Sequence, residues 1–108
     1  MTVLVDAENV RRSTWPNVGR EELVGLVERW ARQEAVTAVV VFDGTAPEGA
    51  VGSGWQSADD WITGKAAELS EAGVTYRLVT SDRELRRRAG GGAETVVGGG
   101  RFLRELLA

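Results

Sequence analysis

Four short runs of mostly apolar residues predict β-strands, at residues 2–5, 38–42, 74–79 and 95–97. Within each run hydrophobic residues follow one another almost without interruption, as in the sequence AVVVF of the second run. Continuous hydrophobicity, rather than alternation, is typical of strands that are covered on both faces in a parallel sheet. The pattern therefore predicts a buried parallel sheet.

Stretches with helical spacing of apolar residues lie between these runs. Residues 20–34 and 57–72 repeat apolar positions at intervals of three or four, and residues 81–89 and 101–107 predict two shorter helices. Alternation of strand and helix implies right-handed crossovers and a three-layer α/β/α sandwich. A chain of 108 residues without an internal repeat is expected to form one domain over its whole length, and residues 44–54 are its longest irregular stretch.

The composition narrows the possible chemistry, because the chain contains no cysteine and no histidine. Disulfides, thiolate nucleophiles, Ser-His-Asp triads and ordinary zinc sites are thereby excluded. Catalysis would rest on carboxylates, hydroxyls, amides and arginines. Carboxylate oxygens are hard ligands, so the cofactor expected at an acidic site is Mg²⁺ or Mn²⁺.

Charge and hydropathy predict a cytoplasmic protein with no membrane association. No leader-like segment opens the sequence, and no apolar run approaches 18 residues. The formal net charge is −3, yet the basic residues are 12 arginines against one lysine. Arginine suits phosphate recognition, because its planar guanidinium binds phosphate oxygens in a bidentate way.

Acidic and polar residues follow the predicted strands and open the predicted helices. The carboxyl ends of parallel strands share one edge of a sheet, where ligands commonly bind, so these side chains are expected to converge there. Clustered carboxylates repel one another unless a cation neutralises them, which predicts a divalent-metal site. The residues concerned are Asp6, Asn9, Asp43, Asp59, Asp60, Ser81 and Asp82.

A purely structural role for the helix-start residues is the alternative. The segments 57–60 and 81–84 resemble capping boxes, in which acidic side chains stabilise helix N-termini. Arg11 and Arg83 follow the acids closely and are candidates for holding phosphates, although solvated helix faces also carry arginines. Trp15 and Trp55 lie in loops at the same edge and could stack on unpaired bases, although packing is the commoner role of tryptophan.

Four short motifs in this order resemble the NYN domains, and in particular their YacP-like branch, which is related to PIN-domain ribonucleases. The motifs are VDAEN at residues 5–9, VFDG at 41–44, SADDWI at 57–62 and VTSDRE at 79–84. The resemblance implies a PIN-like, Rossmann-like fold with a four-stranded parallel sheet in the order 2-1-3-4. It also implies a metal-dependent endoribonuclease that hydrolyses single-stranded or messenger RNA, with ribosome-bound RNA as one option.

The same resemblance implies roles for individual residues. Asp6 and Asp82 would be the central metal ligands, and the acid that opens the second long helix would be Asp59 or, because the acid is doubled here, Asp60. Asp43 and Asn9 match further members of the catalytic set.

Beyond the metal ligands, Asn9 and Ser81 would orient water or phosphate, and Arg11 and Arg83 would hold the RNA strand. Two other functions stay open: a non-catalytic RNA-binding or protein-binding adaptor of the same fold, and a metal-dependent phosphatase for small molecules. A homodimer that enlarges the RNA surface also stays open.

Overall fold

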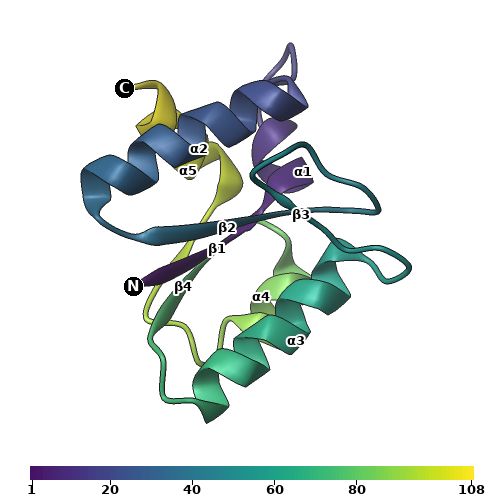
Figure 1. Cartoon of the computed structure of the whole chain (residues 1–108), viewed down its shortest axis with the longest axis vertical. Coiled ribbons are helices and arrows are strands. Elements are labelled where there is room, and N and C mark those ends of the chain that lie inside the picture. Colours follow the sequence, from purple (N-terminus) through teal and green to yellow (C-terminus); the bar gives the residue numbers. More distant parts are fainter.

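The computed structural model describes residues 1–108 and contains one parallel sheet with helices on both faces (Figure 1). The strand order is β3-β2-β1-β4-β5, and every neighbouring pair is parallel. Helices α1, α2 and α5 cover one face, and α3 and α4 cover the other. This arrangement confirms the predicted three-layer sandwich. The elements are β1 Thr2–Asp6, α1 Ala7–Arg11, α2 Arg20–Glu34, β2 Thr37–Phe42, β3 Val51–Gly52, α3 Ala58–Glu71, β4 Tyr76–Val79, α4 Arg83–Ala89, β5 Val96–Val97 and α5 Gly99–Leu107.

The sheet has five strands, so the expectation of four was wrong. The additional strand is β3, which pairs with the end of β2 at the sheet edge, within the stretch expected to be irregular. Its two residues are too few to form a hydropathy pattern. Gly52 is required there, because a Cβ atom would lie 2.4 Å from the carbonyl oxygen of Gly44. Without β3, the order β2-β1-β4-β5 is the predicted order 2-1-3-4.

Helix α1 was also absent from the sequence prediction. It begins directly after β1 and has only five residues, fewer than periodicity can reveal. Ala7 and Val10 are its buried residues, and it packs against α5. This short helix positions the residues that follow the first strand.

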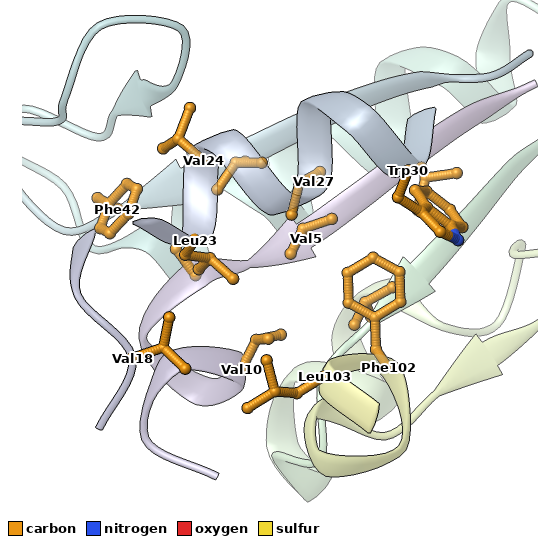
Figure 2. Packing of buried hydrophobic residues seen from close by; sticks show 14 residues of the cluster. Val5, Val10, Val18, Leu23, Val24, Val27, Trp30, Phe42, Phe102 and Leu103 are labelled. Carbon is orange, nitrogen blue, oxygen red and sulfur yellow. The ribbon is translucent and has the colours of Figure 1, made fainter. Parts of the chain in front are cut away.

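Two apolar clusters, one on each face of the sheet, hold the layers together. The strand β1 supplies both, because Val3 and Val5 enter one cluster while Leu4 enters the other. Figure 2 shows the first cluster, in which side chains of α2 and α5 meet β1. Trp30 contacts Phe102 edge to face, with ring centroids 4.9 Å apart. Burial of both faces explains why the strands are continuously hydrophobic.

No helix is both long and apolar enough to cross a membrane.

The fold also determines where the polar residues that follow the strands lie. Because all strands run in the same direction, the polar residues that follow β1, β2 and β4 meet at one edge of the sheet.

Candidate functional site

A polar pocket of about 460 Å³ opens at the carboxyl edge of the sheet, where β1, β2 and β4 end and α1, α3 and α4 begin. None of its lining side chains is hydrophobic, and five of them are carboxylates. Six of the predicted site residues line it, from five separate segments of the chain. The lining residues are Asp6, Glu8, Asn9, Arg12, Ser13, Asp43, Asp59, Ser81 and Asp82.

Asp6 is the buried member of this acidic set, with a relative exposure of 6%. One of its carboxylate oxygens accepts a hydrogen bond from the Thr80 hydroxyl at 2.8 Å. Burial raises the pKa of Asp6 to about 6, and repulsion from Asp59, Asp43 and Asp82 adds to the effect, while the Thr80 hydrogen bond opposes it. The ionised form of Asp6 is therefore destabilised in this position, and a nearby cation would stabilise it.

Asp43 and Asp82 each serve as helix caps and still face the pocket. Asp43 Oδ1 accepts a hydrogen bond from the Ala58 backbone N–H, and Asp82 Oδ1 accepts one from the Leu85 N–H, both at 2.8 Å. In each carboxylate the second oxygen has no hydrogen-bond partner within the protein. The capping role was foreseen for Asp82 but not for Asp43, which caps α3 from the end of β2, and one oxygen of each carboxylate stays available to a ligand.

The two adjacent aspartates at the start of α3, Asp59 and Asp60, have different surroundings in the structure. Asp59 lines the pocket, and its pKa is raised by burial and by the neighbouring carboxylates of Asp82 and Asp43. Asp60 lies outside the pocket, because its carboxylate pairs with Arg88 of α4 at 2.6 Å. Of the two acids that the sequence offered, the structure thus places Asp59 at the pocket and Asp60 outside it.

Asn9 and Ser81 bind each other across the pocket floor. The Asn9 side-chain oxygen accepts a hydrogen bond from the Ser81 N–H at 2.8 Å, and Ser81 Oγ accepts one from the Gly99 N–H at 2.8 Å. Gly99 leaves no room for a side chain, because a Cβ atom would lie 2.3 Å from Asn9 Oδ1. These contacts join α1, the β4–α4 loop and α5 into one support for the site.

The predicted substrate-binding arginines lie outside the pocket. Arg11 donates two hydrogen bonds to Glu8 and one to the Val18 carbonyl, and it does not line the pocket. Arg83 is exposed at the first position of α4 but does not line the cavity. Arg12 lines it instead, with an ion pair to Glu8 at 3.0 Å.

Sequence reasoning missed Glu8 and Ser13 as pocket residues, and it chose Arg11 rather than its neighbour Arg12 as the substrate-binding residue. Glu8 and Arg12 are separated by four positions, which places them on one face of a helix. That spacing would have identified them if the five-residue α1 had been recognised. The Arg11 hydrogen bond and the charges of the neighbouring arginines lower the pKa of Glu8, so this carboxylate stays ionised and is paired with Arg11 and Arg12.

The donors in the pocket fit a hard cation in kind, although they are not gathered into a preformed ligand cage. No three acidic side chains stand close enough together to hold an ion as a group. Mg²⁺ at sites that act on phosphates typically retains waters and takes only one or two carboxylates. The oxygen-only pocket around Asp6 meets that smaller requirement.

Comparison with known proteins bears on the fold. No family model matches the chain, and no curated protein matches its sequence. A crystal structure of Rae1 (YacP) from Bacillus subtilis, as a W164L mutant, is similar with a TM-score of 0.81 and 22% identity, over 99% of this chain and 74% of that one. Another Rae1 (YacP) crystal structure gives a TM-score of 0.73 and 19% identity over the same shares. The chain therefore has the fold of YacP, as its four motifs indicated.

Proposed function

We propose that this chain is a metal-dependent endoribonuclease that hydrolyses RNA phosphodiester bonds at the acidic pocket. The observation that carries the proposal is the convergence of four aspartates on one cavity without any apolar lining. They come from β1, the β2–β3 connection, α3 and the start of α4. Only one of them, Asp6, is buried, and burial raises its pKa.

The anionic cluster is costly to the folded protein in the absence of a cation. Asp6 is desolvated, and Asp59 and Asp82 add repulsion. Local structure explains the presence of Asp43 and Asp82 as caps, but a cap does not require a buried carboxylate beside it. Asp6 and Asp82 would hold Mg²⁺ or Mn²⁺ with water as the remaining ligands, and Asp59 would add negative charge beside the ion. Either ion would lower the pKa of a bound water and offset negative charge on the phosphate.

The protein's own groups would orient the reactants. Ser81 Oγ accepts a hydrogen bond from Gly99, and its hydroxyl hydrogen stays available to a phosphate oxygen. The Asn9 amide uses its oxygen on Ser81 and keeps its N–H groups for water or phosphate. Arg12, on the rim of the pocket, takes the role that the sequence suggested for Arg11 and Arg83.

Single-stranded RNA is the proposed substrate class. Trp15 and Trp55 have relative exposures of 88% and 106%, so neither contributes to the core. Trp15 lies two residues after the pocket residue Ser13, and Trp55 lies four residues before Asp59. Exposed aromatic rings that are close in the sequence to such pocket residues are suited to stacking on unpaired bases. Messenger RNA, free or on the ribosome, belongs to this class.

A non-catalytic adaptor is the second candidate, and one observation favours it. Asp43 and Asp82 are both satisfied as helix caps, so those two acids have a role without any metal. An adaptor that binds through apolar surface would depend little on salt, whereas RNA held by several phosphate contacts would bind much more weakly as salt is added.

Cleavage of an end-labelled single-stranded RNA in the presence of Mg²⁺ or Mn²⁺ tests the proposal. The wild-type protein should cut it, and Asp6→Asn should reduce the rate by at least about 100-fold, as expected when a group that stabilises transition-state charge is lost. Asp60→Asn is the matched control, because Asp60 lies outside the pocket and should leave the rate unchanged. Activity that survives in Asp6→Asn would place the chemistry elsewhere or in a contaminant.

A further inference from the structure

A second cavity, of about 380 Å³, adjoins the acidic pocket at the end of β2. The two cavities share Glu8, Arg12 and Asp43 as lining residues, so they form one continuous groove along the carboxyl edge of the sheet. The second cavity adds Arg20 and Thr45 from the two segments that flank this corner of the fold. The groove thus extends across β4, β1 and β2, over about 10 Å at the usual strand spacing.

The charge of the groove changes along its length. The acidic pocket has five carboxylates and one arginine, whereas the second cavity has two of each. Of its two carboxylates, Glu8 is already paired with Arg11 from outside the cavity as well as with Arg12. The second cavity is therefore far less negative than the first and suits an anion rather than a cation.

Arg20 is held in place but keeps most of its hydrogen-bonding capacity. Its guanidinium donates one hydrogen bond to the Thr45 carbonyl at 2.6 Å and lies 4.8 Å from the centre of the Phe42 ring. A guanidinium has five N–H donors, so four remain without a protein partner. Phe42 is buried beneath it and is unavailable for base stacking. A fixed guanidinium with free donors is well suited to bidentate binding of a phosphate.

Arg12 lines the same cavity. Its side chain has a relative exposure of 64%, and its ion pair with Glu8 uses one of its terminal nitrogens. Arg12 directly follows α1 and Arg20 is the first residue of α2, and both line one cavity although residues 13–19 separate them in the sequence.

We propose that this cavity is a phosphate subsite, in which Arg12 and Arg20 bind the RNA phosphate next to the one at the acidic pocket. The subsite presupposes the proposed ribonuclease function and gives it a direction: the strand runs from the β4 end of the groove toward the start of α2. It also explains why the predicted Arg11 and Arg83 can lie outside the pocket.

The dependence of RNA affinity on salt tests the subsite directly. Binding of a short single-stranded RNA is measured on Asp6→Asn protein, which does not cleave it, with and without Arg20→Gln or Arg12→Gln. Each arginine change should weaken binding about fivefold and reduce the slope of log Kd against log salt by about 0.7, the value for one phosphate contact on a single strand. Arg32→Gln, in the exposed last turn of α2, should alter neither.

Two further readouts separate the possible failures. Thermal stabilisation by Mn²⁺ should be unchanged in the Arg20→Gln single variant, which retains Asp6, because the acidic pocket stays intact. If Arg20→Gln also abolishes this stabilisation, Arg20 braces the loop at Thr45, and the salt slope of Arg12→Gln then decides between the subsite and a structural role, because the one ion pair of Arg12 is with Glu8. A salt slope equal to that of Arg32→Gln overturns the subsite and leaves the ribonuclease proposal standing. Wild-type protein that neither binds nor cleaves RNA overturns both.

Discussion

The side-chain oxygen of Asn9 accepts a hydrogen bond from the backbone N–H of Ser81 at 2.8 Å, although the two residues are 72 positions apart in the sequence. Ser81 in turn accepts a hydrogen bond from Gly99. Three segments that each look like an ordinary loop or helix start are thereby fixed to one another around the acidic pocket. The rigidity of the site depends on these contacts, so substitutions at these residues can test their role.

Gly99→Ala should disturb this support. The new methyl group would lie 2.3 Å from Asn9 Oδ1 and 3.1 Å from the Asn9 carbonyl oxygen, so Asn9 must move. We expect a loss of about 1–3 kcal/mol in the free energy of unfolding, typical of an overpacked site, together with reduced RNA cleavage. Denaturant unfolding and the cleavage assay measure the two effects.

Gly100→Ala is the matched control in the same turn of α5. Its methyl group would make only ordinary contacts, at 3.7 Å from the Ser13 side chain. The change should leave stability equal or raise it by up to about 1 kcal/mol, because alanine favours a helix more than glycine does. Equal behaviour of the two variants would argue against a role for the Asn9 contact.

The buried carboxyl group of Asp6 should make the metal-free protein less stable as pH rises. Its pKa is raised from 3.8 to about 6, so the folded protein binds this proton more tightly than the unfolded chain does. Stability from this group is then lost between about pH 4 and 6, and at pH 8 the ionised Asp6 should destabilise the fold by about 3 kcal/mol.

Asp6→Asn removes this penalty and retains an oxygen for the Thr80 hydrogen bond. In the presence of a chelator, the variant should unfold at a higher temperature than wild type at pH 8, with a much smaller difference at pH 4. Thermal unfolding across this range measures both. A variant that is less stable than wild type at pH 8 would show that the Asp6 carboxylate contributes favourably without metal.

Divalent cations should stabilise the wild-type protein. At a Mn²⁺ concentration 100 times the dissociation constant, the gain is about 2.7 kcal/mol, or about 10 °C or more in Tm for a domain of this size. Asp6→Asn and Asp82→Asn should lose most of this shift, whereas Asp60→Asn should keep it because Asp60 pairs with Arg88 outside the pocket.

Asp82→Asn can separate metal binding from helix capping, because asparagine also caps helices well. Asp82→Asn should therefore preserve the hydrogen bond from Leu85 and the metal-free stability. Absence of any Mn²⁺-dependent shift in the wild-type protein at millimolar metal would contradict the proposed metal site.

Trp15→Ala and Trp55→Ala should weaken binding of single-stranded RNA without affecting the fold. Each ring that stacks on a base contributes about 1–3 kcal/mol to binding, and neither side chain is buried. The melting temperature should stay the same, and quenching of tryptophan fluorescence by RNA should diminish. Binding of fully paired RNA serves as the control, since its bases are not free to stack; an equal loss for paired and unpaired RNA would argue against stacking.

Local pattern determined the architecture and the position of the site in this protein. Continuous apolar runs separated by helical spacing specify a parallel sheet between helix layers, and acids that follow such strands must meet at one edge. Asp6, Asp43 and Asp82 were identifiable for that reason. The strand β3 and the helix α1 were not, because two and five residues are too short to show a period.

Only the tertiary structure decided which of two adjacent side chains enters the pocket. Neighbours on a helix point about 100° apart, so adjacent residues such as Asp59 and Asp60, or Arg11 and Arg12, can have different partners. The choice depends on partners far away in the sequence or across a loop, such as Arg88 for Asp60 and the Val18 carbonyl for Arg11. A local pattern contains no information about such partners, because packing of whole elements brings them into contact.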